Sequence, residues 1–275
     1  MCTKLEKNQC SDGTKKPVLL CVSFGTSYHD TRRVTIDAIE RSLQEAFPSY
    51  EVRRAFTSKI IIRKLAARDK LMIDTVSAAV EKMIAEGVTE LLLQPTHVIA
   101  GFEYDDIIRD LQPYTEKFNR LNISSPLMKT NKDIKTLANI LTTETKSSAD
   151  EQTAFVWMGH GTAHPVNTVY ETLQHAFIET RHRNHVVGTV EAEPSFEKVL
   201  EQVKKTKATH IVLSPLMIVA GDHAVNDMAS DAPDSWKSRF EKQGYTVTAL
   251  LKGMGEYSAI RQMIVEHAHE ALLND

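Results

Sequence analysis

Three residues in the second half of the chain, His160, Glu191 and His223, carry side chains that bind divalent transition metals. Each follows a short apolar run that predicts a buried strand, and in a parallel sheet the carboxyl ends of the strands share one edge. Two imidazoles and one carboxylate suit a first-row ion such as cobalt, iron, nickel or zinc. The pattern therefore predicts a metal site at this edge of the sheet, with coordination positions left open.

A closed structural metal site is the first alternative to this interpretation. Such a site needs four protein ligands, and the sequence has no Cys-x-x-Cys pair to supply them. A single histidine after a strand is often a hydrogen-bonded structural residue, so the prediction depends on the three residues sharing one edge. Gly159 and Gly161 flank His160, and we expect them to allow a flat ligand to approach the backbone.

Other polar residues are weaker candidates for a site. His97 also follows an expected strand and could contact a ligand or a second metal, although a structural role fits it as well. A basic group could bind substrate carboxylates or simply form an exposed helix face. It consists of Arg53, Arg54, Lys59, Arg63 and Lys64. For the remaining histidines we expect solvated positions; these are His29, His164, His175, His182, His185, His210, His267 and His269.

Strand and helix patterns alternate along the chain. This alternation predicts an α/β fold with parallel sheets and right-handed crossovers. The final helix is expected at residues 258–273. Strands are expected at residues 18–22, 50–56, 88–94 and 123–128, and again at 153–158, 185–190, 209–214 and 245–250.

The two halves of the chain resemble each other, which indicates a duplicated domain. Residues 23–26 match residues 159–162, and residues 94–101 match residues 214–221. In this alignment the apolar Phe24 and Phe56 stand opposite His160 and Glu191, and Glu103 stands opposite His223. We therefore expect the second half to supply the reactive groups and the first half to supply substrate contacts, with the active site in the cleft between them.

The expected division of the chain follows from this repeat. Residues 1–16 form a flexible polar tail, residues 17–142 an N-terminal α/β half, and residues 143–275 a C-terminal α/β half that carries the metal site. The polar run at residues 143–152 is expected to be the linker between them.

Composition narrows the classes of function. The chain has 275 residues, 42% of them hydrophobic and 25% charged, with a formal net charge of -3. Its basic residues are mixed with acidic ones, which argues against nucleic-acid binding. No apolar run is long enough to span a membrane, and residues 1–16 lack the apolar centre of a secretory signal. Cys2, Cys10 and Cys21 cannot form a disulfide framework. We expect a cytoplasmic location, or an exported form if a signal was removed before Cys2.

Several motifs together are similar to the anaerobic cobalt chelatases, and the resemblance extends from about Pro17 to about Leu273. The motif near the C-terminus is the most specific. The matching segments are SFGTSYHD at 23–30, RAFTS at 54–58, IIRKL at 61–65, MGHG at 158–161, VE at 190–191, VAGDHA at 219–224, NDMASD at 226–231 and DSWK at 234–237.

The resemblance implies a class II chelatase fold and insertion of Co²⁺ into sirohydrochlorin on the route to cobalamin, without ATP or another nucleotide and without an additional subunit. His160, Glu191 and His223 match the metal-binding set of the family, and the two histidines match its catalytic residues. They would accept the pyrrole protons. Six residues would contact the substrate, namely Phe24, Arg54, Phe56, Lys59, Arg63 and His97.

Other interpretations remain open at this point. Family members can accept Fe²⁺, so an iron chelatase that makes sirohaem would use the same site. A two-lobed protein that binds metal or tetrapyrrole without inserting it would also fit the pattern. A hydrolase with His160 as base lacks a nucleophile beside it. The expected partners are sirohydrochlorin and a divalent metal, with no nucleic acid and no membrane, and a homo-oligomer is compatible with the sequence.

Overall fold

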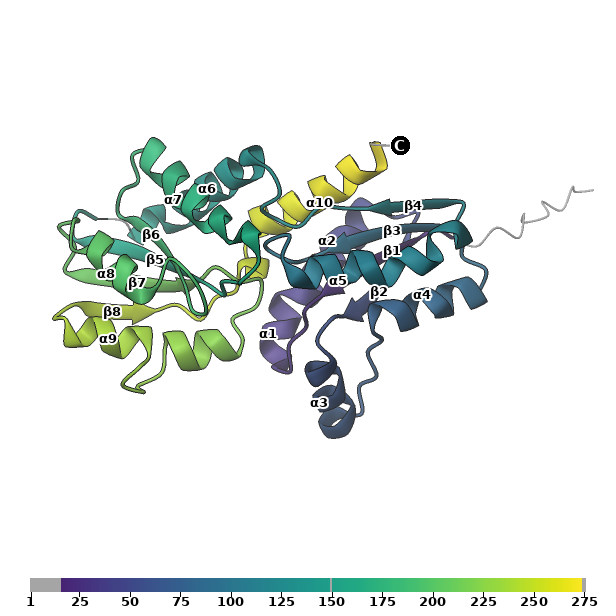
Figure 1. Cartoon of the computed structure of the whole chain (residues 1–275), viewed down its shortest axis with the longest axis horizontal. Coiled ribbons are helices and arrows are strands. Elements are labelled where there is room, and N and C mark those ends of the chain that lie inside the picture. Colours follow the sequence, from purple (N-terminus) through teal and green to yellow (C-terminus); the bar gives the residue numbers. More distant parts are fainter. Residues whose placement is uncertain (1–15, 149, 274–275) are drawn as a thin grey trace, which may run out of the picture.

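The computed structural model describes residues 16–148 and 150–273 and contains two four-stranded parallel sheets flanked by helices (Figure 1). The strand orders are β2-β1-β3-β4 and β6-β5-β7-β8, so the two sheets have the same topology. This confirms the predicted α/β fold of two similar units. The strands are β1 (Val18–Ser23), β2 (Glu51–Phe56), β3 (Glu90–Pro95), β4 (Arg120–Ile123), β5 (Thr153–Gly159), β6 (His185–Thr189), β7 (His210–Pro215) and β8 (Thr246–Ala249).

Helices connect the strands, and several begin at side-chain caps, because a hydroxyl oxygen can accept a hydrogen bond from a free backbone N–H of the first turn. Thr130 and Asp133 form a capping box. The helices are α1 (His29–Val34), α2 (Ile36–Ala46), α3 (Lys59–Asp69), α4 (Val76–Ala85), α5 (Phe102–Leu111), α6 (Asn131–Thr145), α7 (Val169–Glu179), α8 (Phe196–Val203), α9 (Trp236–Lys242) and α10 (Ser258–Leu273). Shorter turns are η1 (Gln112–Lys117), η2 (Lys146–Ser148), η3 (Pro165–Thr168), the π-helical η4 (Ala224–Met228) and η5 (Met254–Glu256).

The inner strands are apolar on both faces because helices cover both sides of each sheet. Every residue of β1 and of β5 is buried. In β1, Leu19 and Cys21 pack into one hydrophobic cluster, whereas Val18, Leu20 and Val22 pack into another. This alternation follows from the two-residue period of a strand. The rigid inner strands fix the direction of the loops that follow them.

The chain crosses between the two units twice, which differs from the expected division at residues 142 and 143. Helix α6 runs through that position and packs against α7 of the second unit, and α10 returns to pack against α2 and β3 of the first (Figure 1). Side chains of β4 hold the end of α10, since Asn122 donates a hydrogen bond to the Ala271 carbonyl at 2.9 Å. One hydrophobic cluster joins the units through residues such as Leu43, Leu137 and Phe155.

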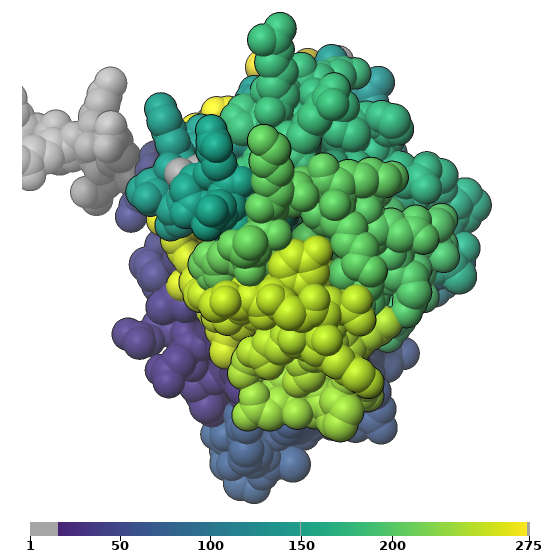
Figure 2. Space-filling model, turned by 90° about the vertical axis from the view of Figure 1, so that its left-hand side faces the viewer, coloured from purple at the N-terminus to yellow at the C-terminus, as the bar shows by residue number. Residues whose placement is uncertain are grey.

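Two further expectations about secondary structure are wrong. The fourth strand is β4, Arg120–Ile123, and not residues 123–128, because an edge strand can carry polar residues such as Asn122 that hide its pattern. The expected linker begins inside α6, which continues to Thr145. The basic segment after β2 forms α3, which projects below the body of the molecule in both views (Figures 1 and 2).

Two of the histidines expected in solvent are buried instead. His185 is 2% exposed, stacks on Phe155 with ring centroids 4.8 Å apart, and accepts a hydrogen bond from the Trp157 indole at 3.1 Å. Burial lowers the pKa of His185 to about 3, so its ring stays neutral. His267 is 5% exposed and lies 3.3 Å from Asp133.

Within the described ranges, no helix has both the length and the apolar character needed to cross a membrane.

Candidate metal centre

His160, Glu191 and His223 come together at the carboxyl edge of the second sheet. They follow β5, β6 and β7, which are adjacent in the strand order. One ligand atom from each residue lies within 4.8 Å of the other two. A metal bound at about 2.0–2.2 Å from each atom would draw them to roughly 3–4 Å apart. Small side-chain rotations would therefore complete the site.

The three side chains are open to solvent, and the two imidazole rings are nearly perpendicular to each other. His160 and His223 have ring centroids 4.7 Å apart and an interplanar angle of 87°, and Nε2 of His160 lies 3.9 Å from Oε1 of Glu191. The exposed fractions are 44% for His160, 54% for Glu191 and 33% for His223. A hydrated ion can reach these atoms directly, and a second ligand can bind the ion from the open side.

The hydrogen bond of His160 fixes which ring nitrogen is free. Its Nδ1 lies 2.8 Å from the Gly161 carbonyl, and because a carbonyl only accepts, Nδ1 carries the proton. The lone pair is then on Nε2, the atom nearest Glu191. Neutral imidazole with this tautomer is the form that binds a metal.

The glycines beside His160 are required by the protein's own packing. A Cβ on Gly159 would lie 2.5 Å from the Tyr170 ring. Gly161 has a φ of +85°, and a Cβ there would lie 2.8 Å from Cβ of Thr189 and 2.9 Å from the backbone nitrogen of Ala192. The two glycines therefore set the path of the backbone that carries His160.

Residues of the first unit contact two segments that carry candidate ligands. Tyr28 donates a hydrogen bond to Asp222 at 3.2 Å, and His164 lies 3.3 Å from Asp105 with its ring 5.0 Å from that of Phe102. In the internal repeat Tyr28 matches His164, and Phe102 matches Asp222. The two contacts are thus repeat-related, and the sequence alignment could have identified them. Desolvation and Asp222 raise the pKa of Tyr28.

Three of the expected substrate contacts are exposed. Phe24 follows β1 directly and is 49% exposed. Lys59 and Arg63 are exposed on the projecting helix α3, where the guanidinium Nε of Arg63 donates to the Lys59 carbonyl at 3.1 Å. Their charged groups can bind carboxylates in this position.

Phe56 and Arg54 were also expected to contact the substrate, but in the structure both side chains contact other residues of the first unit. Phe56 is fully buried, and its ring fills the space beside Gly25. Arg54 donates hydrogen bonds to Asp37 and Glu40, which together raise its pKa against the opposing effect of burial. Sequence reasoning could not separate these roles, because Arg54 lies on β2 and its partners lie on helix α2. Both residues stabilise the first unit in this structure.

His97 is enclosed by the protein. Both ring nitrogens are buried and have no hydrogen-bond partner, and burial lowers the pKa of His97 to about 4. The ring is therefore neutral near pH 7. Its backbone carbonyl accepts from Leu127 at 2.9 Å, which ties the loop after β3 to the next segment.

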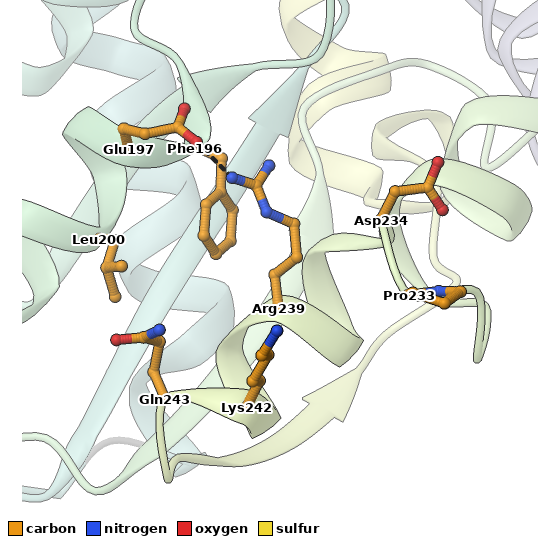
Figure 3. Close-up of a pocket in the computed structure, with 8 residues that line it drawn as sticks. All are labelled: Phe196, Glu197, Leu200, Pro233, Asp234, Arg239, Lys242 and Gln243. Carbon is orange, nitrogen blue, oxygen red and sulfur yellow. Dashed lines mark hydrogen bonds and ion pairs between the residues drawn. The ribbon is translucent and has the colours of Figure 1, made fainter.

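A hollow of about 520 Å³ lies elsewhere in the second unit, between α8 and α9 (Figure 3). The Arg239 guanidinium stacks over Phe196 at 3.7 Å from the ring centroid and donates to Glu197, so its charge is already paired. None of the lining residues belongs to the His160, Glu191 and His223 group. These contacts join α8 to α9.

Two solved structures that are similar in shape show the same fold. SirB from Bacillus subtilis with Fe³⁺ has a TM-score of 0.63 at 12% identity, covering 94% of this chain and 97% of that one. CbiX, the terminal enzyme for biosynthesis of siroheme in denitrifying bacteria, has a TM-score of 0.53 at 15% identity, covering 92% and 99%. At these identities the similarity concerns the fold alone.

Similarity in sequence is closer. The sirohydrochlorin cobaltochelatase of Salmonella typhimurium is 42% identical over 257 residues, which cover 94% of this chain and 97% of that protein. The sirohydrochlorin cobaltochelatase CbiKC of Nitratidesulfovibrio vulgaris is 33% identical over 262 residues, covering 94% and 91%. The family model described as cobalt chelatase (CbiK) matches residues 17–273. The chain belongs to the cobalt chelatase (CbiK) family.

Proposed function

We propose that the protein inserts Co²⁺ into sirohydrochlorin, and that His160, Glu191 and His223 hold the ion before transfer. The observation that carries this proposal is the convergence of the three ligand atoms within 4.8 Å on a surface open to solvent. The names of the two sequence relatives support the choice of substrate and metal.

The chemistry requires the ion to lose water, the ring nitrogens to point their lone pairs at the ion, and two pyrrole protons to leave. With three protein ligands, Co²⁺ keeps open positions that macrocycle nitrogens can occupy. As the ion moves to the macrocycle, the imidazoles of His160 and His223 are released. Each then has a free lone pair that can accept a departing proton, which is a common role of histidine near neutral pH.

The macrocycle would lie against the exposed face of Phe24, with its carboxylates near the exposed charges of Lys59 and Arg63. Arg54 and Phe56 would act indirectly, by fixing β2 and the loop at Gly25. His97 would support the loop after β3 and would not touch the substrate, because both of its ring nitrogens are shielded.

The reaction would need no ATP or other nucleotide and no additional subunit. Supporting this, the sequence has no glycine-rich phosphate loop with its lysine, and Gly159-His160-Gly161-Thr162 does not match one. We also propose a cytoplasmic location, in agreement with a biosynthetic reaction.

An absorption assay with sirohydrochlorin and Co²⁺ tests the proposal. Insertion changes the macrocycle spectrum, and His160→Ala should reduce the insertion rate by at least 100-fold, whereas the exposed His175→Ala should not change it. Unchanged turnover by His160→Ala at limiting Co²⁺ would contradict the proposed site. Many turnovers per protein molecule distinguish an enzyme from a binding protein.

Iron is the second metal to test, because the same nitrogen and oxygen ligands accept Fe²⁺. Anaerobic competition between Co²⁺ and Fe²⁺ at equal concentrations measures the preference directly. We expect the cobalt product to dominate, and a dominant iron product would favour a ferrochelatase that makes sirohaem.

A further inference from the structure

His223 is held by a carboxylate outside the His160, Glu191 and His223 group. Its Nδ1 lies 2.7 Å from Oδ2 of Asp227, four residues later in the chain. Asp227 is 45% exposed at its side chain, but its oxygen is directed to the ring of His223. This contact is 1.2 Å shorter than the 3.9 Å separation between His160 and Glu191.

The local backbone fixes this pair. His223 is the residue before the π-helical turn Ala224–Met228, an uncommon turn that is often found at functional sites. The first and last residues of the turn, Ala224 and Met228, are fully buried in the hydrophobic cluster of the second unit. The Val225 N–H donates to the Gly221 carbonyl at 3.0 Å. Asp227 therefore sits on an anchored turn, and its position does not depend on a long flexible side chain.

A carboxylate acts only as an acceptor, so the nitrogen facing Asp227 must carry the proton. The lone pair of His223 is then on Nε2, as it is in His160. The two histidines reach the same tautomer by different means. His160 uses the backbone carbonyl of Gly161, whereas His223 uses a side chain that can be replaced.

We propose that Asp227 is a positioning residue, which fixes the tautomer and the ring orientation of His223 so that Nε2 faces the substrate metal. The inference rests on the proposed function of the site. A carboxylate behind a metal-binding histidine also makes the ring a stronger ligand, and loss of such a partner typically costs about 10–100-fold in metal affinity or activity.

The tautomer can be measured without metal and without turnover. In the metal-free protein, ¹⁵N NMR of the His223 ring should show the proton on Nδ1, and Asp227→Ala should move a large part of the population to Nε2–H. Asp227→Asn should retain most of the Nδ1–H form, since the amide oxygen can still accept from it. The matched control is Asp231→Asn, because Asp231 lies on the same segment but is 92% exposed and pairs with Lys237 at 2.7 Å.

Cobalt binding supplies the second measurement. In a titration of the visible cobalt bands, Asp227→Ala should raise the dissociation constant of Co²⁺ by about 10–100-fold, Asp227→Asn by less, and Asp231→Asn by less than twofold. The KM for Co²⁺ should rise in parallel, while the KM for the macrocycle stays within twofold.

The proposal is overturned if Asp227→Ala keeps the wild-type tautomer and cobalt affinity, or if it changes only the KM for the macrocycle. His223→Ala separates this outcome from failure of the proposed function. If His223→Ala loses cobalt binding while Asp227→Ala does not, the metal site stands and only the role of Asp227 is wrong. If His160→Ala and His223→Ala both keep wild-type cobalt binding, the site itself is wrong.

Discussion

The hydroxyl of Tyr28 in the first unit donates a hydrogen bond to Asp222 in the second at 3.2 Å, next to His223 in the sequence. This bond joins residues 194 positions apart and lies at the edge of the candidate metal site. In the proposed function the substrate ring comes close to His223, and the ring would then have to pass this hydrogen bond between the two units.

Removal of this hydrogen bond should speed entry of the macrocycle. An exposed hydrogen bond contributes about 0.5–1.5 kcal/mol, so Tyr28→Phe should favour separation of the units by roughly 2- to 10-fold. Stopped-flow absorbance should show a macrocycle association rate that is higher by a similar factor, with unchanged Co²⁺ affinity. Tyr114→Phe is the matched control, because Tyr114 makes a comparable exposed bond to Glu81 at 2.6 Å within the first unit. An unchanged association rate in Tyr28→Phe would show that the bond does not limit entry.

Gly161→Ala should destabilise the protein and disturb His160. Gly161 has a φ of +85° and no room for a Cβ, whereas Gly87 has a φ of +80° with nothing within 4 Å. We expect Gly87→Ala to cost about 1 kcal/mol for the backbone conformation alone and Gly161→Ala about 2–4 kcal/mol. Urea denaturation measures both values. Only Gly161→Ala should also weaken Co²⁺ binding, and equal losses of stability would contradict the packing argument.

Stability should fall on acidification below about pH 6.5. Burial lowers the pKa of His185 to about 3 and that of His97 to about 4, both from an ordinary value of 6.5. At a pH between the lowered pKa of each histidine and 6.5, the unfolded chain binds more protons than the folded one. The free energy of unfolding therefore rises with pH in this range, by up to about 1.4 kcal/mol per pH unit for each histidine. Urea denaturation between pH 5 and 7 measures the slope.

His185→Gln should reduce this slope by close to the amount that the uptake of one proton contributes. His175→Gln, at an exposed position, should leave the slope unchanged. Glutamine offers an oxygen to the Trp157 indole in place of Nδ1. A wild-type slope in His185→Gln would show that His185 does not cause the acid sensitivity.

Arg54→Ala should affect stability more than substrate binding. It leaves Asp37 and Glu40 without their shared partner in a partly buried position, a loss of roughly 2–4 kcal/mol. The KM for sirohydrochlorin should stay within about twofold, because the Arg54 guanidinium is already occupied. Arg63→Ala should show the reverse, with near-normal stability and a higher KM. Denaturation and steady-state assays together test the pair, and a large KM effect in Arg54→Ala would restore it as a substrate contact.

The sequence was sufficient to predict what depends on strong local patterns. The inner strands β1 and β5 are continuous apolar runs, and the three candidate ligands follow strands whose order puts their ends together. The repeat also gave the matching topology of the two sheets. These features are encoded within short segments, so a single chain reveals them.

What the sequence did not reveal depends on contacts between distant segments. Arg54 looked available because Asp37 and Glu40 belong to a separate helix, and Phe56 looked like a ligand contact because its burial beneath Gly25 needs the folded loop. Asp227 was part of a recognised motif, but its direction depends on the π-helical turn. The packing of α10 on the first unit could not be read from its apolar residues, which fit either partner.

The return of α10 to the first sheet has a consequence for synthesis of the protein. Residues 258–273 cover α2 and β3 and receive hydrogen bonds from β4 at their carbonyl ends. The amino-terminal lobe therefore lacks one of its walls until translation is almost complete. A nascent chain that has left the ribosome through residue 250 still exposes that apolar surface. Division of the gene at its middle would also leave each lobe without a helix that remains attached to the other.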